Sequence, residues 1–104
     1  MIYNLKFKLS ALKAWEELDG SVKSQFKKKL KERLKNPHIP SARLSSLPDC
    51  YKIKLRSVGY RLVYQVNDDT VVVTVIAVGQ RDKNKVYKLA NAILNSSDEE
   101  VGEN

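Results

Sequence analysis

The sequence predicts a single small α+β domain, in which helices pack against one face of an antiparallel sheet. Three observations predict it: the alternating stretch CYKIKLRSVGYRLVYQV (50–66), the continuously apolar run VVVTVIAV (71–78), and helix-period apolar stripes on either side of them. At 104 residues the chain is long enough for one hydrophobic core. The predicted element order is strand, helix, helix, three strands and helix.

The first strand and the first helix are predicted from the N-terminal stretch. Residues 2–8 (IYNLKFK) alternate between polar and apolar side chains, which indicates a half-buried strand. Its core-facing side chains are Tyr3, Leu5 and Phe7. A short helix with Ser10 as its N-cap follows, because apolar residues recur every three positions until Asp19-Gly20.

A second helix is predicted from a Ser21 cap to about Lys35. Its lysine-rich surface has two interpretations, an ordinary solvated face or a flank that attracts phosphate without sequence preference. Residues 36–48 hold all three prolines and are predicted to form a loop. The single histidine, His38, lies in this loop, where a surface or packing role is expected.

The stretch 50–66 is predicted to be a hairpin with one apolar face and one cationic face. Side chains of a strand alternate between faces, so the apolar residues of the first arm share one side and its three cations share the other. These cations are Lys52, Lys54 and Arg56. Like charges repel along a strand, which indicates that something anionic binds there.

Arg61, on the second arm, joins the cationic face only if the turn near Ser57-Val58-Gly59 has an even length. A two-residue turn would place Lys54 opposite Arg61, and a four-residue turn would place Arg56 opposite Arg61. Either turn makes one basic patch. An odd-length turn would divide it.

The apolar run 71–78 is predicted to be an interior strand covered on both faces. Arg81 is the first charge after it, where a strand end would meet the rim of an active site. The last helix runs to Leu94 and carries Tyr87 near its start, either as a functional side chain or as packing. Tyr60 and Tyr64 are expected in the core.

Composition favours an intracellular protein with a polyanionic partner, nucleic acid first. Nineteen Lys and Arg against twelve Asp and Glu give a net charge of +7. One cysteine and one histidine exclude an internal disulfide and make a Cys/His metal cage implausible. No apolar run reaches the roughly 18 residues of a membrane helix, so we expect no membrane association and a cytoplasmic location.

The chain divides into a domain of residues 1–94 and a C-terminal tail of residues 95–104. Four of the twelve acidic residues lie in the last seven positions, which leaves nineteen basic against eight acidic residues in the domain. The polar, acidic composition of the tail predicts disorder.

The chain resembles the RelE toxin family of bacterial type II toxin-antitoxin systems. The resemblance is carried by the segment PDCYKIKLRSVGYRLVYQV, by VGQRDKNKVY after it and by LKAWEEL before it. The resemblance covers about residues 1–94. It implies an endoribonuclease that cuts messenger RNA in the ribosomal A site and arrests translation. It also implies inhibition by a cognate antitoxin and no cofactor.

The functional positions of the family fall on residues of the expected type. They are Lys52, Lys54, Arg61, Arg81 and Tyr87. The chain departs from the family at Ser45-Ser46, where related toxins can carry arginine and glycine. We expect Arg43 to replace this phosphate contact in part, and Arg56 is a further possible RNA contact.

Metal-independent RNA cleavage uses the adjacent 2′-OH as nucleophile, and it needs a base, an acid and cations. We assign the base to Lys54 with help from Lys52, the phosphate clamp to Arg61, and stabilisation of the leaving 5′ oxygen to Arg81. Two alternatives remain: a module that binds RNA or the ribosome without cleaving, and a gyrase-targeting toxin of the same superfamily.

Overall fold

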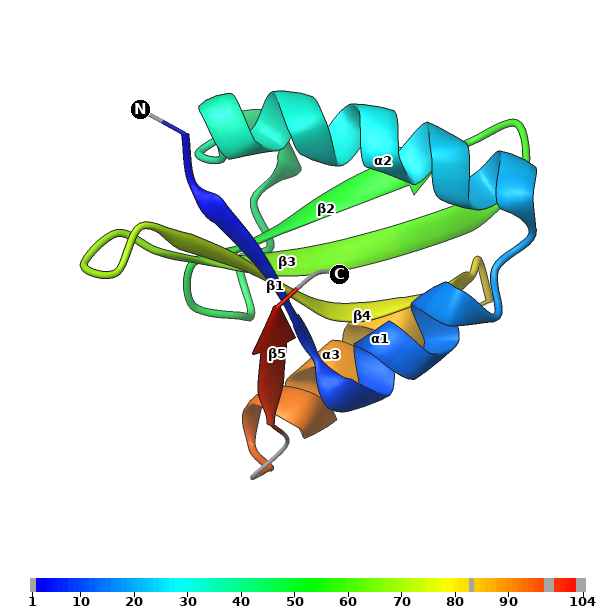
Figure 1. Cartoon of the computed structure of the whole chain (residues 1–104). Coiled ribbons are helices and arrows are strands. Elements are labelled where there is room, and N and C mark those ends of the chain that lie inside the picture. The colour runs from blue at the N-terminus through cyan, green and yellow to red at the C-terminus, as the bar shows by residue number, and fades with distance from the viewer. Residues whose placement is uncertain (1, 83, 97–98, 103–104) are drawn as a thin grey trace.

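The computed structural model describes residues 2–82, 84–96 and 99–102, which fold as one α+β unit (Figure 1). The elements are β1 (Asn4–Lys8), α1 (Leu9–Glu16), α2 (Gly20–Lys35), a short 3-10 helix (Pro40–Ala42), β2 (Cys50–Leu55), β3 (Tyr60–Asn67), β4 (Val72–Gln80), α3 (Lys85–Leu94) and β5 (Glu100–Gly102). This order confirms the predicted class and the predicted succession of elements as far as α3. No described helix is long and apolar enough to cross a membrane.

The five strands form one sheet in the order β2-β3-β4-β1-β5. β2, β3 and β4 are antiparallel neighbours, whereas β1 runs parallel to β4, with Asn4 beside Val72 and Phe7 beside Val75. The sheet is therefore mixed, and the prediction of a purely antiparallel sheet is wrong at this pair. Apolar alternation reveals which face of a strand is buried, but not the direction in which the strand runs beside its neighbour.

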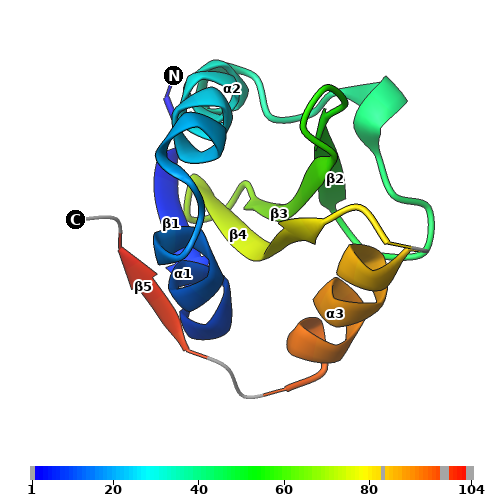
Figure 2. The same ribbon diagram turned by 90° about the vertical axis from the view of Figure 1, so that its right-hand side faces the viewer.

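Helices cover both faces of the sheet, α1 and α2 on one side and α3 on the other (Figure 2). The first core contains Trp15 of α1 and Phe26 of α2, both buried against sheet residues such as Phe7. The second core is smaller and joins α3 to the opposite face through Val86, Ala90 and Ile93. The expectation that all helices share one face is thus wrong for α3, which lies on the same face as the basic residues.

β4 is central and buried along most of its length, as its continuous apolar run predicted. A β-bulge lies opposite the Val63–Tyr64 step, because Val63 pairs with Ala77 and Tyr64 pairs with Val75. The extra residue, Ile76, packs with Ala77 in the α3 core. Tyr64 is fully buried in the first core, as predicted.

Two predicted helix caps differ from the structure. α1 begins at Leu9, with Lys8 rather than Ser10 in the N-cap position. α2 begins at Gly20, and its N-cap is Asp19, whose carboxylate accepts hydrogen bonds from the Ser21 N–H at 3.1 Å and from its hydroxyl at 2.6 Å. Serine and aspartate both suit an N-cap, so neighbouring candidates are not separated by sequence alone.

Part of the C-terminal tail, for which the composition predicts disorder, forms a short strand beside β1 in the structure. β5 pairs with β1, with Lys8 beside Glu100, and the Leu9 N–H donates to the Glu99 carbonyl at 2.7 Å. The hydroxyl of Thr74, a buried side chain of β4, donates to the Glu100 carboxylate at 2.7 Å. Residues 97, 98, 103 and 104 lie outside the described part of the chain. Backbone pairing with β1 overrides the polar composition of the tail.

Candidate active site

The loop between β2 and β3 gives the basic face the parity that the sequence required. Lys54 lies directly opposite Arg61, and residues 56–59 form a loop of even length. Gly59 has a φ of 69°, and its N–H donates to the Leu55 carbonyl at 2.9 Å to close the turn. Glycine adopts this left-handed conformation without strain. Lys54 and Arg61 therefore share one face. This pairing is the one predicted for a two-residue turn, although four residues lie between the two strands.

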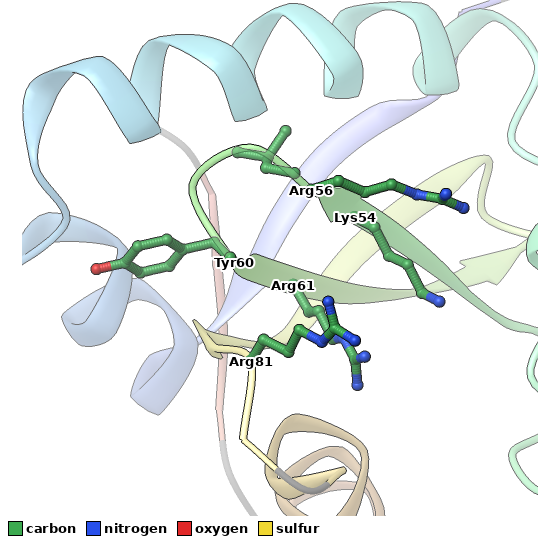
Figure 3. Close-up of a pocket in the computed structure, with 7 residues that line it drawn as sticks. Lys54, Arg56, Tyr60, Arg61 and Arg81 are labelled. Atoms are coloured by element: carbon green, nitrogen blue, oxygen red, sulfur yellow. The ribbon is translucent and has the colours of Figure 1, made fainter.

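A cavity of about 240 Å³ lies at this end of the sheet (Figure 3). It is lined by Lys54, Leu55, Arg56, Gly59, Tyr60, Arg61 and Arg81. Figure 3 shows Lys54, Arg61 and Arg81 extending to the same side of the hairpin, whereas Tyr60 points the opposite way. Four of the seven lining residues are cations and none is acidic, which makes the cavity suited to an anion.

Arg81 reaches the cavity because the end of β4 is joined to the hairpin loop. Its backbone N–H donates to the Gly59 carbonyl at 2.6 Å. β3 and β4 are paired as far as Tyr60 and Gln80, so Arg81 follows immediately after the last pair. Gly59, Leu55 and Tyr60 were not predicted to belong to the site. Their place there depends on the β3–β4 register, which has no local sequence signal.

The electrostatics of the cavity act on Lys54. The charge of Lys52 lowers the pKa of the Lys54 amine, and desolvation lowers it further, followed by Arg61, Arg56 and Arg81. None of these four cations has an ion-pair partner within the described residues. A lowered pKa leaves a larger fraction of the amine neutral near pH 7, which is the form that accepts a proton.

Arg61 is also in contact with α3. Its guanidinium carbon lies 5.2 Å from the centroid of the Tyr87 ring, a cation–π distance. The Nε atom of Arg61 and the hydroxyl of Tyr87 are both buried, and neither has a hydrogen-bond partner among the described residues. α3 starts after Asn84 in a left-handed conformation, with a φ of 64°, and so directs Tyr87 toward the hairpin.

Other sequence-predicted residues lie outside the cavity lining. Lys52 is two residues before Lys54 on the same face of β2, close enough to dominate its pKa. Arg43 forms an isolated antiparallel bridge with Tyr51. Residues opposite one another share a face, so Arg43 is on the side of Tyr51 and away from Lys52. Of the two possible RNA contacts, the structure brings Arg56 into the cavity but not Arg43.

Cys50 and His38 are not among the residues that line the cavity. Burial, with a contribution from Asp49, raises the pKa of the Cys50 thiol to about 12, so the thiol stays protonated. His38 bonds the Tyr51 hydroxyl and the Asp68 carboxylate, both at 2.9 Å, remote from the cavity lining. In residues 2–82, 84–96 and 99–102, no three His, Cys, Asp or Glu side chains gather closely enough to hold a metal ion.

Known proteins resemble this chain in sequence and fold. A family model for the ParE toxin of the type II toxin-antitoxin system parDE matches residues 5–85. The mRNA interferase toxin RelE of Escherichia coli (strain K12) is 56% identical over 90 residues, 86% of this chain and 95% of that protein.

Two solved structures of E. coli RelE also match. A double arginine-to-alanine variant in the free state has a TM-score of 0.82 and 53% identity, covering 88% of this chain and 97% of that one. Such a variant bound to a peptide of the antitoxin RelB has a TM-score of 0.76 and 54% identity, covering 86% and 95%. The fold and these likenesses define a toxin of a type II toxin-antitoxin system. Among such toxins, the chain belongs to the RelE family.

Proposed function

We infer that this chain is a toxin that cleaves messenger RNA in the ribosomal A site and so inhibits translation. The observation that carries this proposal is the cationic cavity in which Lys54 lies opposite Arg61 and Arg81 closes the rim. The name of the E. coli relative, an mRNA interferase toxin, supports the same activity. The proposed activity is that of an endoribonuclease that uses the 2′-OH of the RNA and no metal ion.

The reaction begins with the 2′-OH of the nucleotide before the cleaved bond. Lys54 in its neutral form removes the proton, and the oxygen attacks the adjacent phosphorus as the bond to the 5′ oxygen breaks. The products are a 2′,3′-cyclic phosphate and a free 5′-OH. The leaving 5′ oxygen takes its proton from water and protonated Lys54 returns its proton to solvent, so no co-reactant other than water is needed. Lys52 assists by lowering the pKa of Lys54. DNA lacks the 2′-OH and is not a substrate by this route.

Arg61 and Tyr87 act as a pair on the scissile nucleotide. The Arg61 guanidinium binds the non-bridging phosphate oxygens, where charge develops in the transition state. Its buried Nε and the buried Tyr87 hydroxyl are polar groups that a bound phosphate or ribose would satisfy. The Tyr87 ring holds the guanidinium in position through the cation–π contact and orients the 2′-OH.

Arg81 serves the leaving 5′ oxygen by electrostatic stabilisation, because arginine does not give up its proton in proteins. Arg56, at the cavity rim, binds a neighbouring phosphate. The cavity lining contains neither histidine nor carboxylate, so it has no ordinary acid–base pair. Such a site depends strongly on substrate positioning, which the ribosome supplies by presenting the message in the A site.

The test is cleavage of message on programmed ribosomes. Purified chain added to ribosomes with a defined codon in the A site should produce a new 5′ end within that codon, and Arg81→Ala should reduce it by about 10²-fold or more. Free message without ribosomes is the control for ribosome dependence. Stable binding with intact message would support a non-cleaving module instead and would overturn the proposal.

Two further parts of the proposal concern partners and location. RelE of E. coli has been solved with a peptide of the antitoxin RelB, and we expect a cognate antitoxin to inhibit this chain in the cytoplasm, where its ribosomal target lies. Co-expression with a RelB-type antitoxin should restore translation. The gyrase-targeting alternative predicts inhibited supercoiling, and unchanged supercoiling during toxin induction would remove it.

A further inference from the structure

Arg33 is a cation of α2 that lies beside the apolar stripe of this helix and not on its solvated surface. It follows the buried Phe26 by seven residues and the buried Leu30 by three, which puts all three on one side of the helix. Arg33 is half-buried, whereas Lys29 of the same helix is exposed. Among the described residues Arg33 has no carboxylate partner.

The partners of Arg33 belong to both arms of the hairpin. Its Nη1 donates to the Lys52 carbonyl at 3.2 Å and to the Tyr64 hydroxyl at 2.9 Å. The guanidinium carbon lies 5.7 Å from the centroid of the Tyr64 ring. Tyr64 itself is fixed, because it is fully buried and its hydroxyl donates to the Pro37 carbonyl at 2.7 Å. Arg33 therefore connects α2 to a rigid side chain of β3 and to the backbone of β2.

The Lys52 carbonyl is on the outer side of the sheet, since β2 is an edge strand. Alternate residues of an edge strand direct their carbonyls away from the sheet. The carbonyl of Cys50, two residues earlier, is bound by the Leu44 N–H at 2.9 Å. The Lys52 carbonyl is bound by Arg33. These two contacts hold the outer side of β2 immediately before Lys54.

We propose that Arg33 is a positioning residue for RNA cleavage, which holds the backbone of β2 at Lys52 so that the Lys52 and Lys54 amines keep the separation that the reaction uses. This inference rests on the proposed function. Arg33 acts from the face of the sheet opposite the cavity and does not touch the substrate. Loss of its contact frees one side of an edge strand, and an error of about 1 Å in a catalytic group can reduce rates by up to 10²-fold.

The experiment measures single-turnover cleavage of message on saturating programmed ribosomes between about pH 6 and 9. The variants are Arg33→Met, which removes the donor and the charge, and Arg33→Gln, which keeps an N–H donor without the charge. Lys29→Met is the matched control, because it removes the same charge from an exposed position of the same helix. Ribosome affinity is measured separately for each protein.

Arg33→Met should cleave about tenfold more slowly at saturation while its ribosome affinity stays the same. The acid limb of its pH profile should move to higher pH, because a displaced Lys52 acts less on Lys54, whose other cationic neighbours are Arg56, Arg61 and Arg81. Arg33→Gln should recover part of the rate, and Lys29→Met should match the parent in rate and profile.

The inference is overturned if Arg33→Met cleaves at the parent rate with an unchanged profile, or if it lowers ribosome affinity alone. If thermal melting shows that Arg33→Met does not fold, Arg33→Gln is compared with the parent in its place. A parent-like pH profile of the cleavage rate together with reduced ribosome affinity would again overturn the inference. Failure of the proposed function is distinguishable, because the parent chain itself would then leave ribosome-bound message intact.

Discussion

Two charged regions of the molecule have different surroundings. In the turn between β3 and β4, Asp68 accepts a hydrogen bond from the Tyr3 hydroxyl at 2.6 Å and contacts His38 at 2.9 Å, and these contacts lower the pKa of its carboxyl group. On the α3 face, Lys54 and Arg61 lie opposite one another. Neither of these cations has an ion-pair partner among the described residues.

The difference supports the proposal that the α3 face of the sheet works on the substrate. Neighbouring like charges disfavour the folded state, so a cluster without carboxylates is maintained against stability. The buried, unpartnered Nε of Arg61 and hydroxyl of Tyr87 add to the same cost. Substitutions on the two faces should consequently separate activity from stability.

The largest expected effect is on catalysis. Lys54→Met removes the general base that we propose, and the cleavage rate on ribosomes should fall by about 10²- to 10⁴-fold. The thermal midpoint should be unchanged or slightly raised, because a repulsive charge leaves the cluster. Single-turnover kinetics and thermal melting measure the two quantities. A parent-like cleavage rate would show that another group is the base.

The converse substitution is Phe26→Ala on the other face. Phe26 is completely buried, and the centroid of its ring lies 6.2 Å from the centroid of the Trp15 ring. Its loss should lower the free energy of unfolding by about 3–5 kcal/mol, measured by denaturant titration. The cleavage rate per folded molecule should remain that of the parent. A large change in that rate would mean that the two faces are coupled beyond Arg33.

A smaller effect is expected on pH dependence. Lys52→Met removes the largest cause of the lowered Lys54 pKa, which should rise toward its ordinary value. The base works in its deprotonated form, so the acid limb of the rate profile should move to higher pH and the rate at neutral pH should drop by up to about tenfold. Arg56→Met, a weaker neighbour, should move the limb less. Equal shifts would argue against Lys52 as the main influence.

The smallest effect is expected from the tail. Removal of residues 95–104 deletes β5 and the hydrogen bond from Thr74 to Glu100. A loss of about 1 kcal/mol corresponds to a thermal midpoint lower by a few degrees. Cleavage should be unaffected if residues 1–94 form the complete toxin domain. Calorimetry and ribosome cleavage test this, and a loss of cleavage would place the tail within the functional unit.

Local patterns predicted the hairpin, its basic face and the interior strand, because each depends on alternation within a few residues. Tyr87 and Arg81 were assigned through resemblance, since their approach to Arg61 and Gly59 requires α3 packing and β3–β4 pairing. No local sequence pattern indicated the parallel β1–β4 pair or the strand β5 either. Arg33 did have a local signal, because a cation seven residues after Phe26 lies beside the apolar stripe of its helix. Its hydrogen bond to the Lys52 carbonyl, however, comes from tertiary packing.

Within the described residues, both borders of the sheet are short or partly covered. On the outer side of β2, the Cys50 and Lys52 carbonyls are bound by Leu44 and Arg33, and on the other side β1 is covered by a three-residue strand. Open strand edges recruit further copies into aggregates, and covered or very short ones do not. The covered borders should therefore disfavour edge-to-edge association between copies of this chain.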